Sequence, residues 1–223
     1  YIVLTMATFI LGTILRSRDD DDAAPRHALS LAAGLIGLIL FVPLIVSSQY
    51  SLLEFSMFGL VTAGCMVLAR ADARFILLPP IAVGLVTVTL LSQLATSVQS
   101  PQASLPPHYM LLTTVFGCLF VVGSYLCIWK CSASRWWSLM SAVCGVAYLL
   151  LARVAPIIVA DTWLDSTAGP EDSMPLPWWL TGAFVTAAYA VLAAPLYRLR
   201  ANEYAARAID ALAAAACACA ALT

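Results

Sequence analysis

Four ionisable side chains stand in or beside long apolar stretches of the sequence, and they are the first candidates for chemistry. Arg153 and Glu54 lie within apolar runs, Asp161 follows directly after one, and His108 ends a polar segment. A charge inside a membrane is expensive and needs a partner or a water-filled cavity. We therefore expect Arg153 to form an ion pair with Glu54 or Asp161, and a substrate-anion site at Arg153 is the alternative.

His108 is the candidate for binding a cofactor. A histidine at a membrane surface can ligate haem iron or titrate near neutral pH. A solvated histidine at the start of a helix is the simpler interpretation. The chain's other histidine, His27, stands in the first connecting segment, which we expect on the opposite side of the membrane. The two imidazoles are therefore not expected to flank one site.

Motifs of other chemistries are not found. The sequence contains no P-loop, no dinucleotide fingerprint, no His-Glu-x-x-His and no Gly-x-Ser-x-Gly. Two cysteine pairs, at 127/131 and 217/219, have no histidine nearby, and buried free cysteine behaves as a small hydrophobic residue. The acidic run Asp19 to Asp22 is typical of a solvated loop, and a divalent-cation site is the alternative. The sequence thus predicts no metal site and no cofactor, and it favours a chain without catalytic activity.

Composition determines the class of protein. Of the 223 residues, 62% are hydrophobic and only 10% are charged, whereas a soluble domain has about 25% charged residues. This balance predicts an integral membrane protein in contact with the lipid bilayer. The net charge of −1 gives no support for nucleic-acid binding.

The apolar runs predict an all-α bundle of seven or eight transmembrane helices, forming a single helical domain over 1–223. A helix needs about 20 apolar residues to cross the hydrocarbon core. An eighth run, Ala208 to Thr223, is rich in alanine and cysteine and reads either as a truncated span or as an interfacial helix. The seven longer runs lie near 1–15, 28–48, 51–69, 75–96, 109–129, 136–160 and 178–197.

Arginine and lysine alternate between the connecting segments and so predict the orientation. The segments at 49–50, 97–108 and 161–177 contain neither residue, whereas each of the other connections has two or more. Because positively charged loops stay on the cytoplasmic side, we expect the N-terminus outside and the stretch from Arg198 to Arg207 inside. Pairs of tryptophans at both ends of spans are typical of the aromatic belts at the two interfaces.

In the order of its features the chain resembles the CcsA family, the haem-handling membrane proteins of cytochrome c maturation. Members begin one span at the outer face with a motif like Asn-Leu-Tyr-Glu-Ser, and here Ser51-Leu-Leu-Glu-Phe-Ser56 stands in that place. Their next outer loop ends in a motif like Ser-His-Trp-Leu-Met-Met-His, and here the segment is Pro107-His108-Tyr-Met-Leu-Leu-Thr113. A tryptophan-rich outer segment comes later in the family, where this chain has Asp161 to Trp179.

The resemblance implies haem as the cofactor, but most residues that would contact haem are missing. The family's Trp-Gly-x-Phe/Tyr-Trp-x-Trp-Asp core is absent, and Thr113 replaces the second histidine of the outer loop. Only His108 carries over, as a haem-facing position. The resemblance therefore implies a degenerate member of the family in an energy-transducing membrane: a bacterial plasma membrane, or an organelle inner or thylakoid membrane.

Three functions follow from these observations. The first is a non-catalytic membrane subunit or scaffold whose partners are other membrane protein subunits of a larger complex. The second is an active haem-handling cytochrome c assembly protein. The third is a small-solute transporter that uses Arg153, which requires this arginine to face an open, water-filled cavity.

Overall fold

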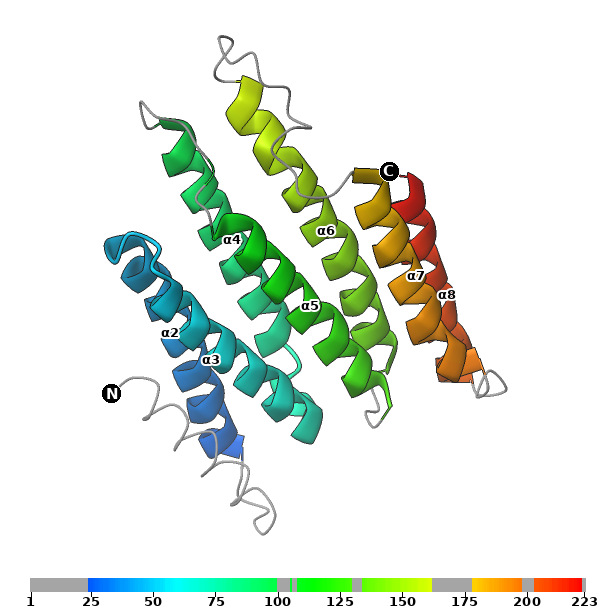
Figure 1. Ribbon diagram of the computed structural model, residues 1–223. Helices are drawn as coiled ribbons and strands as arrows, with labels where there is room; N and C mark the ends of the chain where they lie inside the picture. The colour runs from blue at the N-terminus through cyan, green and yellow to red at the C-terminus, as the bar shows by residue number, and fades with distance from the viewer. Residues whose placement is uncertain are drawn as a thin grey trace. The chain divides into compact units, whose positions relative to one another are not determined.

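The computed structural model describes residues 24–99, 105, 108–129, 134–161, 178–197 and 203–221, and these form helices joined by short turns, with no strand among them. The all-α prediction is thus confirmed for this part of the chain (Figure 1). The first expected span, 1–15, lies outside the described residues. The helices are α2 (Ala24–Ser47), α3 (Leu52–Ala71), the short 3-10 turn η1 (Ala73–Phe75), α4 (Leu78–Gln99), α5 (Tyr109–Ile128), α6 (Ser134–Asp161), α7 (Trp178–Tyr197) and α8 (Glu203–Ala221).

Five helical segments of the described chain are long and apolar enough to cross a membrane, and Leu31–Ser47 of α2 is a shorter apolar helix. Helices of this length and composition mark a multi-pass membrane protein. The total number of spans and the orientation of the N-terminus stay predictions. The five segments are Leu52–Ala71, Ala73–Gln99, Tyr109–Ile128, Arg135–Val159 and Leu180–Tyr197.

The chain forms two compact units, Tyr1–Gln93 and Leu94–Thr223, and the division falls inside α4. Our expectation of a single helical domain over 1–223 stays a prediction.

In the first unit, α2, α3 and α4 are joined by aromatic and hydroxyl contacts. Phe41 of α2 stacks on Phe58 of α3 with ring centroids 5.6 Å apart. The turn between these helices holds Tyr50, whose hydroxyl group lies 3.2 Å from the Oγ atom of Ser92 on α4. This hydrogen bond ties the turn to the C-terminal half of α4.

Ser51 and Glu54 contact each other at the start of α3, where the Ser51 side chain makes no capping hydrogen bond to the backbone. Ser51 precedes the helix and donates a hydrogen bond from its Oγ atom to the carboxylate of Glu54, three residues later. A glutamate in the first turn also interacts favourably with the positive end of the helix dipole. The Ser-Leu-Leu-Glu sequence therefore works locally as a helix start.

Two helices of the first unit differ from the expected boundaries. α2 begins at Ala24, before the expected residue 28, and so includes His27. α4 begins at Leu78, after a separate 3-10 turn, and this places Pro79 and Pro80 in its first turn. Proline is tolerated there because the first N–H groups of a helix have no intrahelical acceptor.

In the second unit, α5 and α6 run antiparallel and close together. A Cβ atom added to Gly117 of α5 would lie 3.1 Å from the Cβ atom of Tyr148 on α6. Toward the other end of the pair, Ser141 of α6 donates a hydrogen bond to the backbone of Val121 on α5. The start of α5 and the end of α6 therefore lie at the same end of the unit, as the charges of the loops predict.

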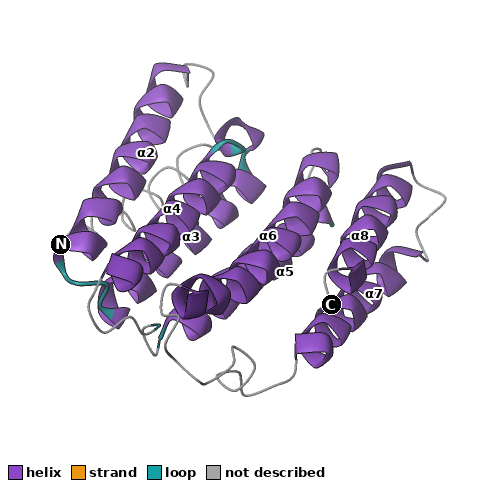
Figure 2. Ribbon diagram, turned by 90° about the horizontal axis from the view of Figure 1, so that it is seen from above, coloured by secondary structure: helices purple, strands orange, loops and turns teal. Residues whose placement is uncertain are grey.

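α8 runs beside α7 and also packs against α6 (Figures 1 and 2). It begins at Glu203, five residues before the expected Ala208. Its buried residues recur three and four apart and are mostly small, which allows the backbones of neighbouring helices to approach closely. These residues are Ala205, Ala208, Leu212, Ala215 and Cys219.

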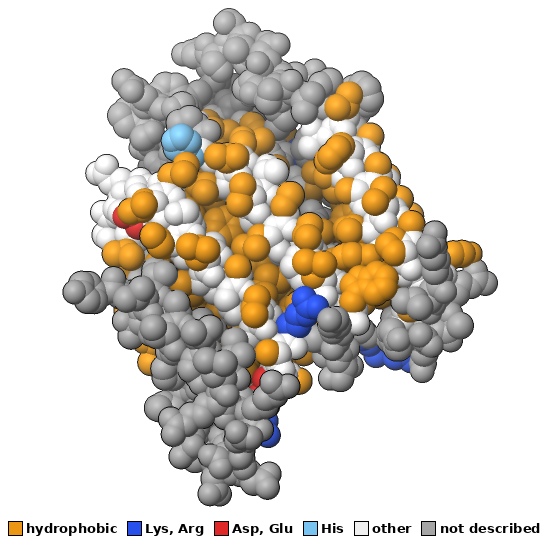
Figure 3. Space-filling view, turned by 60° about the horizontal axis from the view of Figure 1, so that its bottom comes forward, with side chains coloured by type: hydrophobic (Ala, Val, Ile, Leu, Met, Phe, Trp, Pro, Cys, Tyr) orange, Lys and Arg blue, Asp and Glu red, His pale blue; other side chains and the backbone are white. Residues whose placement is uncertain are grey.

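The surface agrees with an environment of lipid. In the face that Figure 3 shows, most of the coloured side chains are hydrophobic and only a few are charged. Large apolar side chains such as Leu53, Leu60 and Val143 are more than half exposed. In a bilayer such side chains contact acyl chains at no cost.

Candidate functional site

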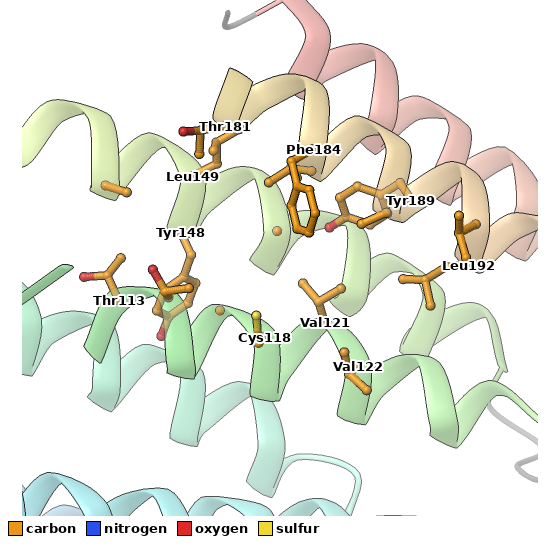
Figure 4. Close-up of a pocket in the computed structure, with 17 residues that line it drawn as sticks. Thr113, Cys118, Val121, Val122, Tyr148, Leu149, Thr181, Phe184, Tyr189 and Leu192 are labelled. Carbon is orange, nitrogen blue, oxygen red and sulfur yellow. The ribbon is translucent and has the colours of Figure 1, made fainter. Parts of the chain in front are cut away.

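An apolar groove of about 370 Å³ lies in the second unit between α5, α6 and α7 (Figure 4). This volume is in the range of small-molecule sites. Phe184 and Tyr189 project from α7 into the space beside Cys118 and Val121 of α5. The lining consists of Thr113, Thr114, Gly117, Cys118, Val121, Val122, Gly145, Tyr148, Leu149, Ala152, Thr181, Phe184, Val185, Ala188, Tyr189, Val191 and Leu192.

A chain of hydrogen bonds through Ser141 joins the three helices at one level of the groove. The phenol of Tyr189 on α7 donates to the backbone oxygen of Ser141 on α6 at 2.9 Å. The Oγ atom of Ser141 in turn donates to the backbone oxygen of Val121 on α5 at 3.1 Å. Tyr189 and Ser141 are both buried. This chain of bonds links α7 to α6 and α6 to α5.

Two further hydroxyl groups of the groove, those of Thr113 and Thr114, also form hydrogen bonds within the protein. Thr113 and Thr114 donate to the backbone oxygens of Tyr109 and Met110 at 2.9 and 2.8 Å. None of the lining side chains is charged. The groove therefore favours an occupant without charge and without a need for hydrogen bonds.

One side of the groove is open. Phe184 and Val191 of α7 are 75% and 70% exposed, and the thiol-bearing Cys118 of α5 is also exposed. In the bilayer this open side faces acyl chains or a neighbouring protein. The groove is therefore accessible from the membrane.

Arg153, the centre of the predicted ion pair, is half-buried on α6 and is not among the residues that line the groove. Because α6 continues to Asp161, the two residues lie eight apart on one helix, about 12 Å along its axis. Side chains on one helix face each other at spacings of three or four. The side chain of Asp161 lies outside the described residues, and Glu54 belongs to the first unit. Both ion pairs stay predictions.

His108 comes directly before α5, is exposed, and makes no capping hydrogen bond with its side chain. It is not a lining residue of the groove. Across the described residues, no three side chains of histidine, cysteine, aspartate or glutamate are grouped as a metal ion would require. The role of His108 as a haem-facing residue stays a prediction.

The residues that form the groove were not among the candidates from the sequence. Two signals point to them in retrospect. A tyrosine in the middle of an apolar span, such as Tyr189, needs a hydrogen-bond acceptor for its hydroxyl group. A glycine in a membrane helix, such as Gly145, often marks the close approach of another helix.

Comparison with known proteins does not assign the chain to a family: no family model, no curated protein and no solved structure matches it. The resemblance to the CcsA family therefore rests on the short motifs described above and stays a prediction.

Proposed function

We propose that this protein is a non-catalytic subunit of a larger membrane complex and that it holds a transmembrane helix of another subunit along α7. The observation that carries this proposal is the burial of α7. Only 17% of the residues in its apolar stretch are buried, against 39 to 44% in the other four candidate spans. A membrane helix with so much uncovered surface is suited to contact a further helix.

The exposed surface of α7 has the chemistry for a helix contact. Ala183, Ala187, Ala190 and Ala194 are all exposed and recur four, three and four residues apart, so they form one face of the helix. We call this face the alanine stripe. Small residues at such spacing let two backbones approach closely, which is a main source of helix association in membranes.

Neighbouring alanines on α7 supply the test and its control. Ala187 is in the alanine stripe, whereas Ala188 lines the groove, and both are exposed. The tagged chain is purified from its native membranes in mild detergent, and proteins that accompany it in fixed proportion are measured by mass spectrometry. We expect Ala187→Leu to lose the accompanying subunit and Ala188→Leu to keep it.

Three results would contradict the proposal. One is a chain that purifies as a single copy without a companion. Another is a set of companions that both variants retain equally. A companion that proves to be a second copy of this chain also contradicts it, because the proposed partner is a different subunit.

The second candidate function is haem handling, and the observation in its favour is the exposed imidazole of His108, which no capping bond occupies. A stable low-spin haem usually needs two strong axial donors, and the described outer end of the second unit has one imidazole. A degenerate CcsA-type scaffold in an energy-transducing membrane is consistent with the first proposal. A Soret band in the purified protein that disappears in His108→Ala would favour the second.

A further inference from the structure

We propose that the groove between α5, α6 and α7 binds one acyl chain of an anionic phospholipid. This site is separate from the alanine stripe and does not depend on the partner helix proposed above. Three properties of the groove support the assignment: its size, the chemistry of its lining, and the charge beyond one of its ends.

The groove has the size and length for an acyl chain. Its volume of about 370 Å³ is in the range of small-molecule sites, and a thin acyl chain can extend along it. The lining runs from Thr113 to Val122 on α5, ten residues that span about 14 Å of helix.

The lining also selects an apolar chain. The hydroxyl groups of Thr113, Thr114 and Tyr189 donate to backbone oxygens of the protein, and the lining contains no charged side chain. Because lipid tails are as apolar as leucine, binding in a bilayer comes from close packing rather than from the hydrophobic effect. The ring of Phe184 (Figure 4) and the backbone at Gly117 and Gly145, which also line the groove, offer such packing.

The headgroup is assigned from the charge beyond one end of the groove. Val122 and Leu192 lie toward the end of the second unit where α6 begins, and Arg135 is exposed in the first turn of α6. Arg135 is six residues before Ser141, about 9 Å along the helix. An arginine at this height can pair with the phosphate of a lipid whose chain lies in the groove.

The experiment uses the full chain in phosphatidylcholine vesicles with a trace of a phospholipid that has a photoreactive diazirine in its acyl chain. Two probes are compared, with phosphatidylglycerol and phosphatidylcholine headgroups, and the adducts are located by peptide mass spectrometry. We expect adducts to concentrate on residues 113–122 and 181–192. We expect Ala188→Leu to remove most of them, because the larger side chain fills the groove.

Matched variants separate this site from general contact with lipid. Ala187→Leu should keep the adducts, since Ala187 does not line the groove. Cys118→Phe fills the groove from the opposite wall and should lose them as Ala188→Leu does. Its unchanged helical circular dichroism would show that the loss is not caused by misfolding. Arg135→Gln should remove the preference for phosphatidylglycerol, and Arg74→Gln, an exposed arginine in the first unit, should not.

Adducts spread evenly over exposed apolar residues such as Leu60 and Val143 would overturn the groove as the site. So would equal adduct yields in Ala187→Leu and Ala188→Leu. Equal labelling by the two headgroups would overturn the assignment of an anionic lipid.

Discussion

The hydroxyl group of Tyr189 on α7 occupies the space beside Gly145 on α6 where any other residue would have its Cβ atom. A Cβ atom built on Gly145 overlaps this oxygen and lies 2.6 Å from the ring carbon that bears it. The same hydroxyl group donates to the backbone oxygen of Ser141, one turn earlier on α6. Contact and hydrogen bond together hold the buried ring of Tyr189 against α6 and set the width of the groove.

Gly145→Ala should therefore destabilise the protein. Either the ring of Tyr189 moves and loses its bond to Ser141, or the helices separate, and such overpacking typically costs about 1–3 kcal/mol. Gly84→Ala is the control, because a Cβ atom there meets nothing within 4 Å. Alanine favours a helix over glycine, so this control should be neutral or stabilising by up to about 1 kcal/mol. Thermal unfolding in mild detergent measures both, and equal unfolding temperatures would contradict the prediction.

Tyr189→Phe should cost about 0.5–1.5 kcal/mol, because it removes the hydrogen bond to Ser141 and little else. The hydroxyl group is also the atom with which the methyl group added by Gly145→Ala would collide. We therefore expect Gly145→Ala to cost less in the Tyr189→Phe background than in the wild type. A double-mutant cycle measures this coupling. Strictly additive effects would show that the two residues do not share one contact.

The fold was largely predictable because a membrane span has a strong local signal. Every span expected within the described residues corresponds to a helix, and the boundaries differ mostly by a few residues. One of the larger differences has a local cause. α4 begins at Leu78 instead of residue 75 because a separate 3-10 turn precedes it, and proline is tolerated in its first turn.

The groove was not predictable, because no local signal in the sequence specifies it. Its position depends on which faces of α5, α6 and α7 meet, and residues about 45 apart in the chain, such as Gly145 and Tyr189, make the contact. Uniformly apolar spans have little periodicity from which a facing side can be read. Charged residues attract attention in a sequence, yet Arg153 and His108 both lie outside the lining.

The backbone conformation of the turn between α2 and α3 can be tested by substitution with glycine. Gln49 and Tyr50 both have positive φ angles, 57° and 59°, in the left-handed region that costs other residues about 1–2 kcal/mol relative to glycine. Gln49→Gly should therefore stabilise the protein by about 1 kcal/mol. Ser48→Gly, at a neighbouring position without a positive φ angle, should bring no such gain. An unfolding temperature of Gln49→Gly below that of the wild type would contradict the positive φ angle at this position.

Arg153 tests the predicted ion pair. If its guanidinium is paired inside the bundle, Arg153→Leu leaves an uncompensated carboxylate, and breaking a buried pair typically costs about 3–5 kcal/mol. We expect reduced accumulation of Arg153→Leu and partial recovery when the true partner is neutralised as well. Glu54→Gln and Asp161→Asn are compared as second substitutions, with accumulation measured by in-gel fluorescence of a tagged chain. If neither second substitution restores accumulation, the alternative of a substrate-anion site at Arg153 is favoured.

The alternation of loop charges predicts which segments share a side of the membrane. Segments 97–108 and 161–177 have no arginine or lysine, whereas Arg70 to Arg74 and Lys130 to Arg135 flank the opposite connections. Within the second unit, the antiparallel contact of Gly117 with Tyr148 agrees with this alternation.

Single cysteines are introduced at positions 102 and 133 of a cysteine-free variant and exposed to an impermeant thiol reagent in intact cells or oriented vesicles. Position 102 should react from outside and position 133 only after permeabilisation, because positively charged loops remain on the cytoplasmic side. Equal access to both positions would refute this topology, and the reversed pattern would invert the orientation while keeping the helices as described.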